Sequence, residues 1–104
     1  MAKLKLTAEP TFRATVPVPI PGAGAADVEF TFKHRTNKAL QAYIDAIEAD
    51  QPDSKIVLDV ASGWDLDDAF TAENVEQLCE SYAGAGLAVF QTYIRELRGA
   101  RAKN

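Results

Sequence analysis

A chain of 104 residues, with 47% hydrophobic and 25% charged residues, has the composition of one globular domain with a modest core. Its net charge of −4 argues against a general role in coating nucleic acid, because such binding depends on basic residues that neutralise phosphates. No apolar run approaches the ~20 residues needed to cross a membrane. The single cysteine, Cys79, excludes an internal disulfide and suits a reducing cytoplasm.

Two alternating stretches near the N-terminus predict a β-hairpin. Apolar residues occupy the even positions of residues 12–20 and again of residues 27–33, and residues 22–26 form a small-residue turn between them. Three prolines lie at odd positions: Pro17, Pro19 and Pro21. Because alternate N–H groups of a strand point to the same edge, the missing donors share one edge. This pattern predicts an edge strand that is protected from further pairing.

Residues 40–47 and residues 55–62 are expected to form the next two elements. The first stretch has apolar residues at helical spacing. The second is ambiguous, since its composition suits a strand while several of its apolar residues share a helical face. We predict a short helix, because capping residues directly precede it. The candidate caps are Thr36 and Asn37 for the first helix, and Asp53 and Ser54 for the second.

Gly84 and Gly86 separate the last two expected helices. The first of these begins after Thr71, its expected N-cap, and a short glycine-containing link predicts that the two pack as an antiparallel pair. The second carries an apolar stripe made of Val89, Phe90, Tyr93, Ile94 and Leu97. Trp64 and Phe70 are expected to close one end of this pair as a structural plug.

These elements together predict an α+β fold, in which an N-terminal β-hairpin is followed by about four α-helices. We expect residues 1–104 to form a single domain. The short segment of residues 1–10 is expected to be a frayed end, with a strand that docks late as the alternative, and the basic tail, residues 98–104, has lost the apolar stripe and is expected to fray.

The residues that could support catalysis do not converge in the sequence. His34 and Cys79 lie on different expected elements, and Cys79 faces the expected core, whereas a Cys–His pair needs a base within hydrogen-bond reach. We therefore predict no catalytic, cofactor-binding or metal-binding residue, and no cofactor.

An acidic cluster and a basic cluster are two further candidate binding sites. Asp65, Asp67 and Glu76 match three ligand positions of a calcium loop, but Phe70 stands where that loop needs glycine, so we interpret them as an acidic turn before a helix. The basic cluster could hold a phosphate or an acidic partner, although a solvated loop is favoured; its members are Lys33, His34, Arg35 and Lys38. The helix aromatics are expected to be core residues rather than a base-stacking platform; they are Tyr43, Tyr82, Phe90 and Tyr93.

Several short motifs follow one another along residues 10–97. They are Pro10-Thr11-Phe12, the proline-interleaved residues 16–22, Phe30-Thr31-Phe32-Lys33-His34-Arg35, Gly63-Trp64 with its acidic turn, residues 70–75, and Leu78, Tyr82 and Tyr93. In this order and spacing they resemble the small tail assembly chaperones of long-tailed bacteriophages. One departure is Ala83, where that pattern has proline, and alanine there is expected to let the helix run slightly further.

The resemblance implies a non-enzymatic protein of the host cytoplasm that binds the tape measure protein while the tail tube protein assembles around it. It implies no nucleic acid and no membrane among the partners, and it leaves self-association possible. Since a tape measure protein is rich in helix, we hypothesise that it binds the stripe around Tyr93 and Leu97, flanked by Arg95 and Arg98. The alternative is that the whole stripe is core. A small regulatory or inhibitor protein that binds another protein remains the alternative function.

Overall fold

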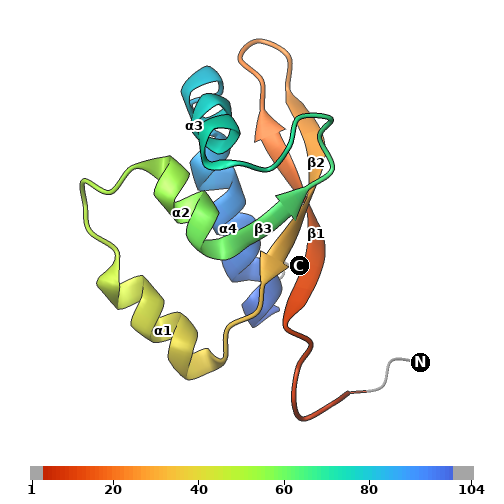
Figure 1. Cartoon of the computed structure of the whole chain (residues 1–104), viewed down its shortest axis with the longest axis vertical. Coiled ribbons are helices and arrows are strands. Elements are labelled where there is room, and N and C mark those ends of the chain that lie inside the picture. The colour runs from red at the N-terminus through yellow and green to blue at the C-terminus, as the bar shows by residue number, and fades with distance from the viewer. Residues whose placement is uncertain (1–3, 100–104) are drawn as a thin grey trace.

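A computed structural model of the chain describes residues 4–99 and has an α+β fold (Figure 1). The strands are β1 (Thr11–Pro19), β2 (Ala25–Lys33) and β3 (Ala61–Trp64), and the helices are α1 (Asn37–Ala46), α2 (Asp53–Val60), α3 (Ala72–Ser81) and α4 (Ala85–Arg98). The strands form one antiparallel sheet in the order β1-β2-β3. The predicted hairpin and four helices are confirmed, whereas the third strand was not expected.

The hairpin follows the predicted alternation. Val16 lies opposite Val28, and Phe12 lies opposite Phe32, so that the even-numbered side chains of both strands face the core. Gly22 and Gly24 have φ angles of 78° and 79°, which residues other than glycine rarely adopt, and they close the turn. Pro21 lies in this turn, outside β1, so only two of the three prolines stand on the strand edge.

The stretch between α1 and α3 divides into a helix and a strand. Val57 and Val60 are fully buried from α2, as the helical pattern predicted, but the helix ends at Val60 and the chain continues as β3. The reason is the open edge of β2, whose outward backbone groups need partners. The predicted caps are wrong, because Pro52 occupies the N-cap position without a side-chain hydrogen bond. By contrast, the predicted caps Thr36 and Thr71 each accept a backbone N–H of the first helical turn.

The core is built jointly by the sheet and the helices. Its buried hydrophobic residues are Val16, Val18, Val28, Phe30, Phe32, Leu40, Val57, Val60, Ala61, Val75, Ala85, Val89 and Tyr93. Helix α2 packs against both α3 and α4, and α4 also packs against β1. Helices α3 and α4 contact each other far less, so the prediction that they pack as an antiparallel pair is wrong.

Glycine decides how closely α2 and α4 approach. A Cβ atom built on Gly86 would lie 2.6 Å from the Cβ of Asp53, a distance that real structures do not tolerate. Gly86 lies inside α4 and lets α2 approach closely; it does not separate two helices, as was predicted. The break is made by Gly84, the N-cap of α4, and α3 already ends at Ser81, so the helix does not run on through Ala83.

The two ends of the described chain differ. Residues 4–10 form neither helix nor strand and are exposed. Arg98 is still helical, and Gly99 ends α4 with a left-handed φ of 65°, so fraying from residue 98 is wrong; residues 100–104 lie outside the described chain. Across residues 4–99, none of the helices combines the length and the apolar character that crossing a bilayer requires.

Candidate protein-binding surfaces

Trp64 packs against the core as a structural residue, although the α3–α4 pair that it was predicted to close does not form. Its ring packs edge-to-face on Phe70, with 5.0 Å between centroids, and on Phe30 at 5.9 Å, and the indole Nε1–H donates to the C=O of Asp68 at 2.7 Å. Asp65 of the acidic turn extends the sheet, because its N–H and its Oδ1 exchange hydrogen bonds with the backbone of Glu29 at 3.0 Å each. The acidic turn thus has a structural role that the sequence did not reveal.

Two members of the basic cluster, Lys33 and Arg35, make structural contacts, while Lys38 is exposed. Lys33 Nζ donates to the C=O of Leu58 at 3.2 Å, and Arg35 Nη2 donates to the C=O of Asp59 at 3.2 Å. Both acceptors belong to the last turn of α2, where unpaired carbonyls and the helix dipole favour cations. These two charges therefore help to hold the C-terminal end of α2 against the end of β2.

Tyr93 connects the same region to α4. Its hydroxyl donates to the C=O of Lys33 at 2.7 Å and accepts from Arg35 Nη1 at 2.9 Å, and its side chain is fully buried. The Arg35 guanidinium also stacks over the ring of Tyr43, 4.3 Å from its centroid. Burial, and then the neighbouring Asp59 carboxylate, raise the pKa of Tyr43 above its ordinary value.

The hypothesis that a partner binds the stripe around Tyr93 and Leu97 is therefore wrong for Tyr93, which is core. Leu97 is partly buried and packs against the core cluster, but together with Arg98 it also lines a hollow of about 400 Å³, so the part of the hypothesis that concerns Leu97 stays a prediction. Of the other predicted core aromatics, Tyr43 and Tyr82 are partly buried against the same cluster, and Phe90 is partly buried.

His34 and Cys79 stay apart, as the sequence indicated. His34 follows β2, where its backbone N–H donates to the C=O of Pro10 at 2.9 Å, while Cys79 is partly buried on α3. Burial, with a further contribution from the Asp53 carboxylate, raises the pKa of the Cys79 thiol from 9.0 to about 11. Such a thiol stays protonated near neutral pH and is a poor nucleophile. Within residues 4–99, no group of three or more His, Cys, Asp or Glu side chains is placed to hold a metal ion.

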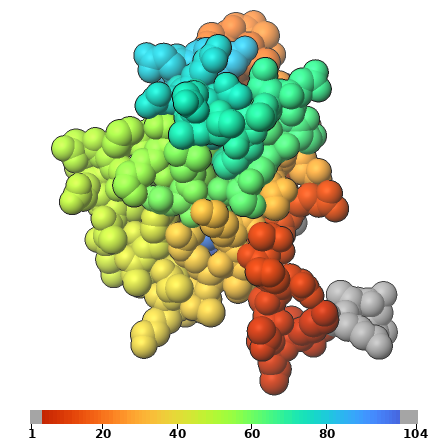
Figure 2. All heavy atoms as spheres, in the orientation of Figure 1, coloured from red at the N-terminus to blue at the C-terminus, as the bar shows by residue number. Residues whose placement is uncertain are grey.

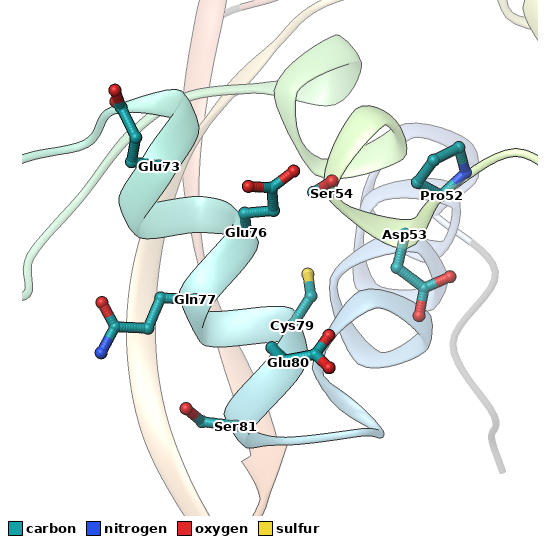
Figure 3. A pocket seen from close by; sticks show the side chains of 9 residues that line it. All are labelled: Pro52, Asp53, Ser54, Glu73, Glu76, Gln77, Cys79, Glu80 and Ser81. Atoms are coloured by element: carbon teal, nitrogen blue, oxygen red, sulfur yellow. The ribbon is translucent and has the colours of Figure 1, made fainter.

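A groove between α2 and α3 is the largest hollow described on the surface, with a volume of about 700 Å³ (Figure 3). Its lining residues are Pro52, Asp53, Ser54, Glu73, Glu76, Gln77, Cys79, Glu80 and Ser81. Four of them are carboxylates, and Figure 3 shows Glu76 and Cys79 on the side of α3 that faces α2. We call this hollow the α2–α3 groove. It is acidic and open, so it suits a positively charged chain segment better than a small molecule.

A second hollow of about 260 Å³ lies on another side of α3. Trp64, Leu78 and Tyr82 supply its apolar part, and Leu66, at its rim, is exposed. Helix α3 therefore stands between two recessed surfaces and presents three glutamates beside them. Sequence reasoning missed both hollows, because each depends on where residues distant in the chain come together.

Open recesses beside an exposed helix, on a small α+β body, suit contact with another protein better than they suit enclosure of a small molecule. A family model described as phage tail assembly chaperone matches residues 1–104, and the chain belongs to this family. It is therefore a non-enzymatic assembly chaperone whose partners are phage tail proteins. Searches among curated proteins and among solved structures give no match.

Proposed function

We propose that this chaperone binds the tape measure protein in the host cytoplasm and keeps it in solution while the tail tube protein assembles, and that residues 1–104 act as one domain. Membership of the phage tail assembly chaperone family is the observation that carries this proposal. A long helical partner that is not yet enclosed by tube subunits exposes apolar faces, and a small protein with open recesses can cover them.

We further propose that the α2–α3 groove receives the tape measure protein. Glu73, Glu76 and Glu80 follow one another at helical spacing along α3 and are exposed. A partner helix with lysine or arginine at matching intervals would pair with them, while its apolar side would lie over Cys79 and Pro52, which line the groove. The bound segment should therefore be a basic amphipathic helix.

Co-expression tests this proposal. Native chaperone should keep an otherwise insoluble tape measure fragment in the soluble fraction, and reversing two groove charges, Glu76→Lys with Glu80→Lys, should abolish that effect. A matched control reverses two exposed charges outside the groove, Glu48→Lys with Asp50→Lys, and should preserve it. Both double variants change the net charge by the same amount, so a loss limited to the first locates the contact.

Two results would count against the proposal. If both double variants rescue the fragment, the groove is not the binding surface. If native chaperone fails to rescue any segment of the tape measure protein, the proposed partner itself is wrong.

A further inference from the structure

The alternation of β1 continues backwards through the segment that precedes it. Residues 4–10, which we call the N-terminal arm, share this pattern with β1. The even positions are all apolar: Leu4, Leu6, Ala8, Pro10, Phe12, Ala14, Val16 and Val18. The odd positions up to residue 15 are all polar: Lys5, Thr7, Glu9, Thr11, Arg13 and Thr15. The arm therefore carries the pattern of a strand with one buried face, although the described sheet gives it no partner strand.

The apolar side of the arm lies in solvent. Leu4 is 94% exposed and Leu6 is 102% exposed, and Figure 2 shows the red N-terminal segment projecting from the body of the molecule. An ion pair between Lys5 and Glu9, at 2.9 Å, joins two exposed side chains within the arm. Such surface pairs contribute little stability, so Glu9 can exchange this partner for another.

The edge of β1 is open over one half only. Even-numbered residues bond to β2, as the hydrogen bonds from His34 N–H to Pro10 C=O and from Ile20 N–H to Gly24 C=O show, so odd-numbered residues point to the free edge. Pro17 and Pro19 have no N–H to offer there, and they block the second half of the edge. The first half retains its donors and acceptors at Thr11, Arg13 and Thr15, so the prediction of a fully protected edge is only half right.

A small hollow lies beside the blocked half of the edge. It has a volume of about 220 Å³ and runs between β1 and α4. Pro17, Pro19 and Leu87 are among its lining residues, and Leu87 is itself 59% exposed. The open donors, the exposed arm and this apolar hollow thus lie along one side of the molecule.

We propose that two copies of this chain associate by exchanging their N-terminal arms. Each arm adds as an antiparallel strand to the open edge of β1 in the second copy, around a two-fold axis at Thr11. In this register Glu9 lies opposite Arg13 of the second copy, and Thr7 lies opposite Thr15 of the second copy. The ion pair between Glu9 and Arg13 occurs twice by symmetry, and opposite charges in directly facing positions stabilise antiparallel strands.

The same register accounts for the apolar residues and for the prolines. Leu6 falls beside Val16 of the second copy and Leu4 beside Val18, next to the hollow that holds Leu87. The ladder ends where Lys5 meets Pro17, which lacks a donor, so the prolines limit the pairing to a dimer instead of an extended sheet. A register centred on Arg13 is excluded, because it would place two arginines opposite each other.

A second copy is the occupant because the arm cannot reach the edge of its own β1. A return would use Glu9 and Pro10 for a turn, and Pro10 already continues the ladder with His34. The arm of a second copy needs no turn to reach this edge, so all of its residues are available for pairing.

Sedimentation equilibrium of the full chain should show a monomer–dimer equilibrium. Glu9→Arg alone, or Arg13→Glu alone, converts both ion pairs into like-charge pairs and should weaken the dimer roughly tenfold or more. Combining Glu9→Arg with Arg13→Glu should restore it. Leu4→Lys with Leu6→Lys should also dissociate the dimer, whereas Leu66→Lys, at an exposed leucine far from the edge, should not.

Cysteine cross-linking tests the register itself. In a Cys79→Ser background, Thr11→Cys should form an intermolecular disulfide on oxidation, because facing residues of a hydrogen-bonded pair have Cα atoms about 5.5 Å apart. Thr15→Cys should not cross-link to itself, because it faces Thr7. Monomers at every concentration, a dimer that the double charge exchange fails to restore, or cross-linking through position 15 in place of position 11 would overturn the proposal. A native chain that stays monomeric while tail proteins protect the arm would also overturn it.

Discussion

Replacing Tyr93 by phenylalanine removes one oxygen atom from the centre of the molecule and tests whether the basic cluster is structural. The hydroxyl makes two hydrogen bonds, to the C=O of Lys33 at 2.7 Å and from Arg35 at 2.9 Å, and the side chain is fully buried. A neutral hydrogen bond contributes about 0.5–1.5 kcal/mol, and one to a charged group contributes about 1.5–3 kcal/mol. Since water can reach part of Arg35, we expect Tyr93→Phe to lower the free energy of unfolding by about 2–3 kcal/mol.

Thermal unfolding followed by circular dichroism measures this effect. For a domain of this size, 1 kcal/mol corresponds to about 4–8 °C in Tm, so the variant should melt roughly 10–20 °C below the native chain. Tyr82→Phe is the matched control, because the Tyr82 hydroxyl has no hydrogen-bond partner among the described residues. If Tyr93→Phe melts within about 2 °C of the native chain, or no lower than the control, then the hydrogen-bond network between β2, α2 and α4 does not stabilise the fold.

Further predictions concern stability and the absence of chemistry. Trp64→Ala should lower the free energy of unfolding by about 3 kcal/mol, the low end for a core aromatic because the ring is partly exposed, as a urea titration would show. Leu97→Asp should lower Tm and reduce the far-UV signal, since Leu97 packs on the core; an intact fold that has lost only partner binding would refute this. His34→Ala should leave tape measure solubilisation intact, because His34 lies outside the α2–α3 groove, and loss of solubilisation in a folded variant would contradict the prediction that His34 is not catalytic. The pKa of Cys79 in the folded chain, about 11, lies above its ordinary value of 9.0, so the free energy of unfolding should fall as the pH rises from 9.0 to about 11, and a Cys79→Ser variant should show a smaller fall, because only the raised pKa of Tyr43 then contributes.

Local pattern was sufficient where neighbours in the sequence determine the structure. The alternation of residues 12–20 and 27–33 follows from one face being buried, and the caps Thr36 and Thr71 need only the first turn of their own helix. The strand β3 escaped prediction because it is four residues long and exists to pair with the outer edge of β2. The sequence of residues 61–64 contains no local signal that these residues pair with β2.

Long-range contacts also explain why the candidate surfaces were misplaced. Arg35 is recognisable as basic but not as buried, because its partners Asp59 and Tyr93 lie 24 and 58 residues further along the chain. The same network removes Tyr93 from the surface and thus from the predicted binding stripe. The acidic groove, in turn, forms only when α2 and α3 meet, although the helical spacing of the glutamates on α3 was visible as a signal.

Hydrogen–deuterium exchange on the complex with the tape measure protein tests the central claim most directly. The native chain, mixed with a soluble tape measure fragment, should show slower exchange across α2 and α3, with little change in α1, whose residues lie outside the α2–α3 groove. No complex at all, or a complex that protects α1 while α2 and α3 exchange at their free rates, would contradict the account.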